Sequence, residues 1–187
     1  MTVVAFIRIS IFFISPVVWA EVFEAIRTRR SIKSYESKPV DKDKLLKVLE
    51  AARLSPSAGN RQPWRFIIVT DPKMKESLRP PQRRGVVLSA PVVIVGCALP
   101  NESFPEAEFW KIDVSIALQN LVLAAWEEGL GTCWLGVFHE EDEIKKALGI
   151  PKDVRVVAMV ALGYPAEKKD PVSDRKQLEQ IIDYNHW

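Results

Sequence analysis

A polar stretch in the first third of the chain gathers side chains that can hold a ligand by hydrogen bonds. Residues 55–64 read Ser-Pro-Ser-Ala-Gly-Asn-Arg-Gln-Pro-Trp, so two hydroxyls, two amides and one guanidinium fall within one short segment. Its two prolines and its glycine prevent a continuous helix there, as in an ordinary helix-to-strand connection. We favour a binding loop, because Trp64 opens an alternating run to Thr70 that predicts a strand and would hold the loop on a rigid edge.

A basic stretch lies nearer the N-terminus, where residues 28–33 read Thr-Arg-Arg-Ser-Ile-Lys. It follows residues 21–28, whose apolar spacing predicts a short helix with Val22, Phe23 and Ile26 on one face. Cations at a helix C-terminus complement the helix dipole, which is one explanation for this run. Three cations and a hydroxyl exceed that need, and guanidinium groups bind phosphate oxygens in bidentate fashion. The stretch is therefore a candidate phosphate site.

Other segments predict the elements that would position these two stretches. Hydrophobic periodicity and chain breakers predict further helices over 42–54 with Asp41 as N-cap, 72–78, 112–128, 140–148 and 178–184, strands over 64–70, 91–98, 131–136 and 154–163, and loops over 79–85 and 99–105. The helix over 112–128 is apolar along most of its length and has Gly129 to stop it. Such a helix must be buried on more than one side, and a subunit interface would cover the second side.

Composition suits one globular domain and narrows its chemistry. Of the 187 residues, 48% are apolar and 27% are charged. A net charge of +2 gives little reason to expect a nucleic-acid partner. Cys97 and Cys133 are far apart without metal-ligand spacing, so we expect no metal site and no disulfide. His139 and His186 lack a hydrolase motif, and no glycine-rich fingerprint predicts a dinucleotide bound in a Rossmann unit.

Residues 56–64 resemble the Pro-Ser-(Ser/Ala)-x-Asn-x-Gln-Pro-Trp signature of the nitroreductase family of FMN-dependent oxidoreductases. Further segments resemble this family in the expected order: residues 29–33 its N-terminal FMN motif, residues 131–136 the segment whose backbone reaches the flavin ring, and residues 174–176 its C-terminal basic site for the FMN phosphate. The resemblance implies one cofactor-binding set, with Lys33 as a candidate for tuning the flavin electronically: Arg29, Arg30, Ser31, Lys33, Pro56, Ser57, Ala58, Asn60, Gln62, Trp134, Leu135, Gly136 and Arg175.

The resemblance also implies a fold and a reaction. The fold is α+β, a mixed and mostly antiparallel sheet wrapped by helices, in an intertwined homodimer with FMN at the interface. The reaction passes electrons from NADH or NADPH to a nitroaromatic, a quinone or a similar small aromatic acceptor, by alternating reduction and reoxidation of bound flavin. The cofactor carries the chemistry, so no catalytic side chain is expected. Alternatives are a relative that fragments flavin with oxygen or dehalogenates aromatic rings, or a flavin-binding protein without turnover.

Residues 1–20 stand apart from this domain, because residues 3–19 are nearly all apolar. A secretory signal would explain the run, although Arg8 sits late and Trp19 is bulky for a cleavage site. A transmembrane anchor is disfavoured, because the stretch falls short of about 20 residues and contains Pro16. We favour an upstream extension, such as an over-long gene start, before a domain over 21–187. The expected protein is therefore cytoplasmic and without a membrane partner.

Overall fold

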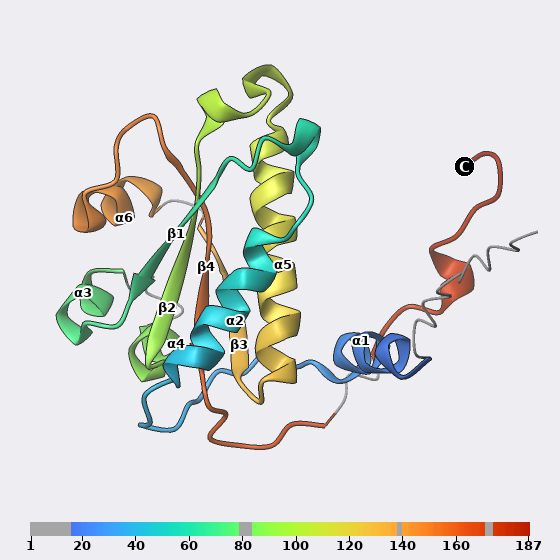
Figure 1. The fold of residues 1–187 in the computed structure, drawn as a ribbon, viewed down its shortest axis with the longest axis horizontal. Coiled ribbons are helices and arrows are strands. Elements are labelled where there is room, and N and C mark those ends of the chain that lie inside the picture. The colour runs from blue at the N-terminus through green and yellow to red at the C-terminus, as the bar shows by residue number, and fades with distance from the viewer. Residues whose placement is uncertain (1–15, 79–83, 138–139, 171–173) are drawn as a thin grey trace, which may run out of the picture.

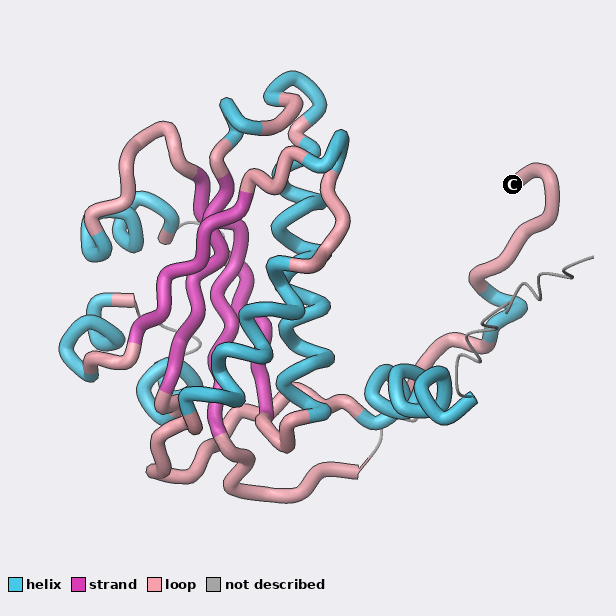
Figure 2. The backbone as a smooth tube through the Cα atoms, viewed as in Figure 1, coloured by secondary structure: helices cyan, strands magenta, loops and turns pink. Residues whose placement is uncertain are grey.

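A four-stranded sheet forms the centre of the computed structural model, which describes residues 16–78, 84–137, 140–170 and 174–187. The strands are β1 (Trp64–Val69), β2 (Val92–Ala98), β3 (Gly131–Gly136) and β4 (Arg155–Gly163). They lie in the order β1-β2-β4-β3, and each neighbouring pair is antiparallel (Figures 1 and 2). Every residue of β2 is buried, as its uninterrupted apolar run predicts for a central strand.

Helices cover both faces of the sheet (Figure 1). One face carries α2 (Lys42–Arg53) and α5 (Phe109–Glu127), and the other carries α3 (Pro72–Ser77), α4 (Arg84–Ser89) and α6 (Glu141–Leu148). Because side chains alternate along a strand, neighbouring residues of β2 enter two different cores. Ile94 joins the core that holds Leu118 of α5, whereas Val95 joins the core that holds Val87 of α4. The predicted α+β architecture is confirmed.

Two predicted helix boundaries have the local chemistry that the sequence indicates. The Asp41 carboxylate accepts a hydrogen bond from the Asp43 N–H at 2.9 Å and so caps the start of α2. Gly129 has a φ of 73°, a left-handed conformation that favours glycine, just after the end of α5. The chain can therefore turn directly from α5 toward β3.

Three helices differ from the sequence prediction near their N-terminal ends. α1 (Pro16–Thr28) includes residues 16–20, ahead of the predicted start at residue 21. α5 begins at Phe109 rather than at residue 112, and its early residue Trp110 is buried against the sheet. α4 starts at Arg84, inside a predicted loop whose residues 79–83 lie outside the described part. Buried Val86 and Val87 show that packing, rather than local propensity, makes this helix.

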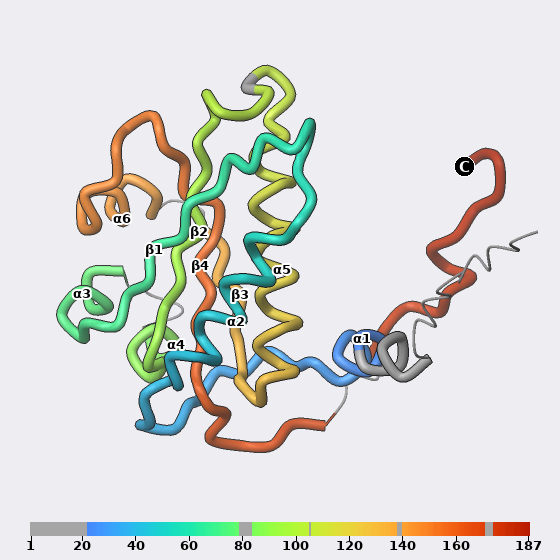
Figure 3. The backbone as a smooth tube through the Cα atoms, viewed as in Figure 1, coloured from blue at the N-terminus to red at the C-terminus, as the bar shows by residue number. Residues whose placement is uncertain are grey.

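The helix predicted over 178–184 is wrong, because the structure has only a 3₁₀ turn there, Leu178–Gln180. Leu178 and Ile181 are each 62% exposed, so little of the described part of the chain packs on them to stabilise a longer helix. The C-terminal segment leaves the body on the same side as α1 (Figure 3). None of the helices in the described ranges is long and apolar enough to cross a membrane.

Glu141 clamps the start of α6 to β4, and this contact should give the protein a measurable acid sensitivity. Its carboxylate accepts hydrogen bonds from the Arg155 guanidinium at 2.8 Å and from the Val156 N–H at 3.0 Å. These bonds, that of Arg155 first, lower the pKa of Glu141 to about 2. A lowered pKa stabilises the folded state above the unfolded pKa near 4.5, and that stability is lost as the pH falls toward 2.

We therefore expect Glu141→Gln to lower the free energy of unfolding by about 1 kcal/mol at pH 7, a modest value because Arg155 is half-exposed. Urea unfolding of both proteins between pH 7 and pH 2 should show the gap closing below pH 4.5. A gap that stays constant over this range would mean that the ionised carboxylate contributes nothing.

Candidate functional site

Five of the predicted site residues meet at one cavity of about 260 Å³. This cavity, called the cationic pocket below, is lined by Arg29, Arg30, Ser31, Lys33, Lys169, Asp174 and Arg175. Five of the lining side chains are cationic and one is acidic. Asp174 lies 3.5 Å from the Arg175 guanidinium, and Lys169 is paired with Glu167 at 3.2 Å, which leaves three cations in excess. The excess of positive charge suits an anionic ligand.

The cations of the N-terminal stretch are not used up by neighbouring acids. Arg27 is paired with Glu24 at 2.7 Å, so its charge is already balanced. By contrast, Arg29, Arg30 and Lys33 make no ion pair with any acid in the part of the chain that the structure describes. Their charges are therefore available to an anionic ligand such as a phosphate.

The fold fixes the position of this basic stretch at both ends. At its start, the Trp126 indole of α5 donates to the Thr28 hydroxyl at 2.9 Å. Further along, the Ile32 N–H donates to the Thr132 carbonyl of β3 at 2.8 Å. The Ile32 side chain packs directly on Gly131, where a Cβ would lie 2.5 Å from Ile32 Cγ1. Glycine at 131 thus lets the basic stretch lie against β3.

The three predicted residues of β3 are available to a ligand to different extents. Trp134 is 38% exposed and Gly136 is also exposed. Leu135 is 1% exposed, so it is buried in the core and does not reach the surface in this chain. Of the three residues, Trp134 and Gly136 are therefore the ones that a ligand could reach from solvent.

The remaining predicted residues lie in the signature loop, residues 55–62, which is folded into a compact turn. Gly59, Asn60 and Gln62 all have positive φ, between 53° and 57°. The Gln62 N–H donates to the Ser57 hydroxyl at 2.9 Å, and the Gln62 amide donates to Asn60 at 3.2 Å. Exposed Pro56 and half-buried Ala58 flank Ser57. Among the described residues, the hydroxyl hydrogen of Ser57 and the amide nitrogen of Asn60 donate no hydrogen bond, so both can meet a ligand.

Within a single chain, the signature loop and the cationic pocket do not lie together. The loop contacts the start of α5, where the Ala58 N–H donates to Asp113, while the basic stretch contacts its end through Trp126. At 1.5 Å per residue, the part of α5 between Asp113 and Trp126 is about 20 Å long. Figure 1 shows the loop near one end of α5 and α1 near the other. The two halves of the predicted site are therefore apart.

Two residues near these halves were missed by the sequence interpretation. Lys169 lines the cationic pocket, but it lies in a charged stretch without a motif, so no sequence signal singled it out. Asp113 is 3% exposed beneath the signature loop. A signal existed for Asp113, since a lone acid within an apolar helical segment is unusual in a core.

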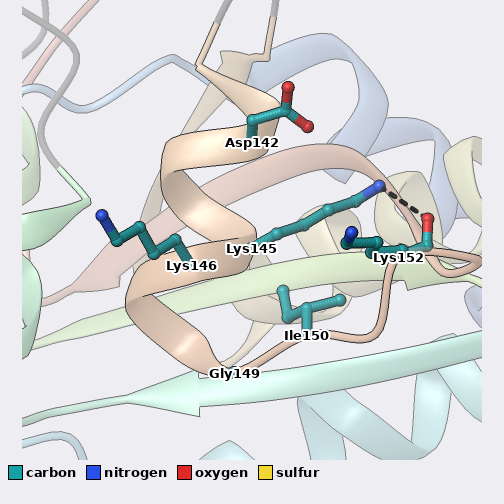
Figure 4. Close-up of a pocket in the computed structure, with 6 residues that line it drawn as sticks. All are labelled: Asp142, Lys145, Lys146, Gly149, Ile150 and Lys152. Atoms are coloured by element: carbon teal, nitrogen blue, oxygen red, sulfur yellow. Dashed lines mark hydrogen bonds between the residues drawn. The ribbon is translucent and has the colours of Figure 1, made fainter.

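The other cavity, the metal-ligating residue types and the cysteines of the described ranges do not indicate a second functional site. The larger cavity, about 620 Å³, is lined by Lys145, Lys146 and Lys152, but Lys146 points away from Lys145 and Lys152 in Figure 4. Lys145 is already bound to Glu141 at 3.1 Å. No group of histidine, cysteine or acidic residues in the described ranges could hold a metal ion. Both cysteines are buried, and burial raises the pKa of Cys97 to about 11.

Comparison with known proteins assigns the chain to a family. The Nitroreductase family model matches residues 26–87 and 80–164. A protein of Archaeoglobus fulgidus, whose name provisionally describes it as an NADH dehydrogenase/NAD(P)H nitroreductase, is 41% identical over 154 residues, which cover 80% of this chain and 88% of the relative.

Solved structures agree with this match. A nitroreductase family protein from Clostridium novyi NT is 40% identical with a TM-score of 0.73, and the match covers 80% of this chain and 88% of that one. An FMN-dependent nitroreductase from Clostridium difficile R20291 is 30% identical with a TM-score of 0.77, over 85% of this chain and 96% of that one. The sequence motifs, the fold and these matches agree, and the chain belongs to the nitroreductase family.

Proposed function

We propose that this protein is an FMN-dependent oxidoreductase that passes electrons from NADH or NADPH to nitroaromatic, quinone or similar acceptors. The observation that carries the proposal is the cationic pocket, where Arg29 and Arg175 converge from opposite ends of the sequence. Its excess of cations, with Arg29, Arg30 and Lys33 outside any ion pair among the described residues, and its volume suit a phosphate group. The names of the relatives, which include an FMN-dependent nitroreductase, support the same cofactor.

The five predicted residues that line the cationic pocket would hold this cofactor. Arg29, Arg30 and Arg175 would bind the phosphate, and Ser31 lies beside them to donate a further hydrogen bond. Lys33 lines the same pocket and would stabilise negative charge on the reduced ring. Bound FMN supplies the hydride chemistry, so the chain needs to bind, orient and tune rather than to provide a nucleophile.

The site also needs a second copy of the chain, and we propose a homodimer in which the signature loop of one chain completes the cationic pocket of the other. Two observations support this: the loop and the pocket are separated along α5, and apolar side chains lie exposed on α1, α5 and the C-terminal segment. These exposed residues are Val22, Phe23, Ile26, Phe109, Ile112, Ile116, Leu178, Ile181, Ile182, Tyr184 and Trp187. Such a surface favours a large subunit interface.

The acceptor is proposed to be a planar aromatic compound. Trp134 is the large aromatic side chain of β3 that remains exposed, and it lies on the strand that supports the basic stretch. Stacking on a flat flavin ring selects for planar molecules, but it does not discriminate between the substituents on their rings. We therefore expect a broad range of quinone and nitroaromatic acceptors.

The visible spectrum of the purified protein tests this function. We expect a yellow protein, or an apo-protein that becomes yellow with FMN, whose colour bleaches anaerobically with NADH or NADPH and returns on adding a quinone or a nitroaromatic compound. Steady consumption of the nicotinamide should accompany this cycle, which distinguishes an enzyme from a flavin-storage protein. A colourless protein that refuses added FMN would contradict the proposal.

A further inference from the structure

The signature loop holds one residue in a conformation that its side chain does not favour. Asn60 and Gln62 have φ of 54° and 53°, in the left-handed region, which asparagine adopts readily but glutamine rarely does. Such backbone persists only where the surroundings hold it. Hydrogen bonds within the loop close the turn, but they do not fix its position on the rest of the protein.

α5 supplies the side chains that attach this loop to the body. The Asn120 amide donates to the Ser55 hydroxyl at 2.8 Å, at the start of the loop. One end of the Asp113 carboxylate, Oδ1, accepts the Ala58 N–H at 2.9 Å, at the first residue of the turn that contains Gly59 and Asn60. Seven residues separate Asp113 and Asn120, which is close to two helical turns, so both lie on one face of α5.

Asp113 is an unusual choice for a purely structural contact. Its side chain is 3% exposed, and its second oxygen, Oδ2, is buried without a hydrogen-bond partner among the described residues. Burying a carboxylate with one oxygen unsatisfied opposes folding, and an apolar residue would pack there more favourably. Stability alone therefore does not explain an acid here, whereas the placement of the loop does.

We propose that Asp113 is a positioning residue that holds the signature loop ready to meet FMN. It acts through the Ala58 N–H and so fixes the direction in which Ser57 and Asn60 face. This inference rests on the proposed function, because the loop is assigned to the cofactor. It goes further in placing part of the cofactor affinity in a buried residue of α5 that touches no ligand.

Titration of apo-protein with FMN and with riboflavin tests the inference. Asp113→Ala should weaken the binding of FMN and of riboflavin by a similar factor, about 10-fold or more. The reason is that the lost hydrogen bond positions the loop and does not contact the phosphate, which only FMN carries. Asp113→Asn keeps an acceptor oxygen for Ala58 and should bind FMN within about threefold of the wild type. An Asn variant as weak as the Ala variant would overturn the role of this hydrogen bond.

Val87→Ala is the matched control, because Val87 is fully buried in the core on the opposite face of the sheet. It should lower the melting temperature while FMN affinity, measured well below that temperature, stays unchanged. If Asp113 were merely structural, Asp113→Ala would behave like this control, and wild-type flavin affinity in that variant would overturn the proposal. Failure of the wild-type protein to bind FMN would instead overturn the proposed function itself.

Ala58→Pro reaches the same hydrogen bond from the loop side and covers the case in which Asp113→Ala does not fold. Ala58 is the first residue of a helical turn and the preceding Ser57 is extended, so proline fits the backbone and removes only the N–H donor. This variant should lose affinity for FMN and riboflavin alike. Unchanged affinity for both flavins in Ala58→Pro would also overturn the proposal.

Discussion

Replacing Arg29 or Arg175 with alanine is expected to weaken FMN binding by about 10- to 150-fold, because a hydrogen bond to a charged group contributes roughly 1.5–3 kcal/mol. Both side chains line the cationic pocket, and Arg29 makes no ion pair with any acid in the described ranges, so its charge is available to a ligand. Riboflavin, which lacks the phosphate, should bind both variants nearly as tightly as the wild type. Fluorescence titration of apo-protein measures both affinities.

Two neighbouring lysines provide a matched pair for the same titration. Lys169 lines the pocket, whereas Lys168 is exposed and does not. Lys169→Ala should therefore reduce the preference for FMN over riboflavin, and Lys168→Ala, with the same change in net charge, should leave it intact. If Arg29→Ala, Arg175→Ala and Lys169→Ala all keep the wild-type preference for FMN over riboflavin, the phosphate does not lie in this pocket.

Local chemistry made much of the fold predictable. Asp41 caps α2, Gly129 ends α5 in a left-handed conformation, and the apolar run of β2 is buried on both faces, all as their sequence neighbourhoods indicate. The elements that failed depend on distant partners. α4 forms because Val87 enters a core, and the predicted C-terminal helix is absent because Ile181 stays 62% exposed and packs on little of what the structure describes.

The candidate site was predictable as a set of residues but not as an arrangement. The motifs identified Arg29, Asn60 and Arg175 from their immediate neighbours. Nothing local could indicate that Arg29 and Arg175 share a cavity, or that the loop with Asn60 contacts the opposite end of α5 from the basic stretch. Lys169 escaped notice because one lysine in a charged stretch has no distinguishing pattern. The role of Asp113 depends on a tertiary hydrogen bond, which a sequence pattern cannot specify.

Mixing two defective variants is expected to restore function if the site is shared between chains. Arg175→Ala damages the cationic pocket, and Asn60→Ala damages the signature loop. In a symmetric dimer with one chain of each kind, one site combines both defects and the other combines an intact pocket with an intact loop. The heterodimer should therefore bind FMN with wild-type affinity at one site and show about half the wild-type activity per dimer.

A different affinity tag on each variant allows the heterodimer to be purified and compared with both parent homodimers. Each parent should bind FMN weakly at both of its sites, because every site in it carries one defect. If pocket and loop served the same site within one chain, each site of the heterodimer would also carry one defect, and no strong site would appear. The separation of Ala58 and Thr28 along α5 favours the first outcome, since both groups are attached to the same rigid helix and cannot close on one ligand without unfolding their contacts to it. A heterodimer with flavin affinity no better than that of its parents would show that the loop of one chain does not complete the pocket of the other.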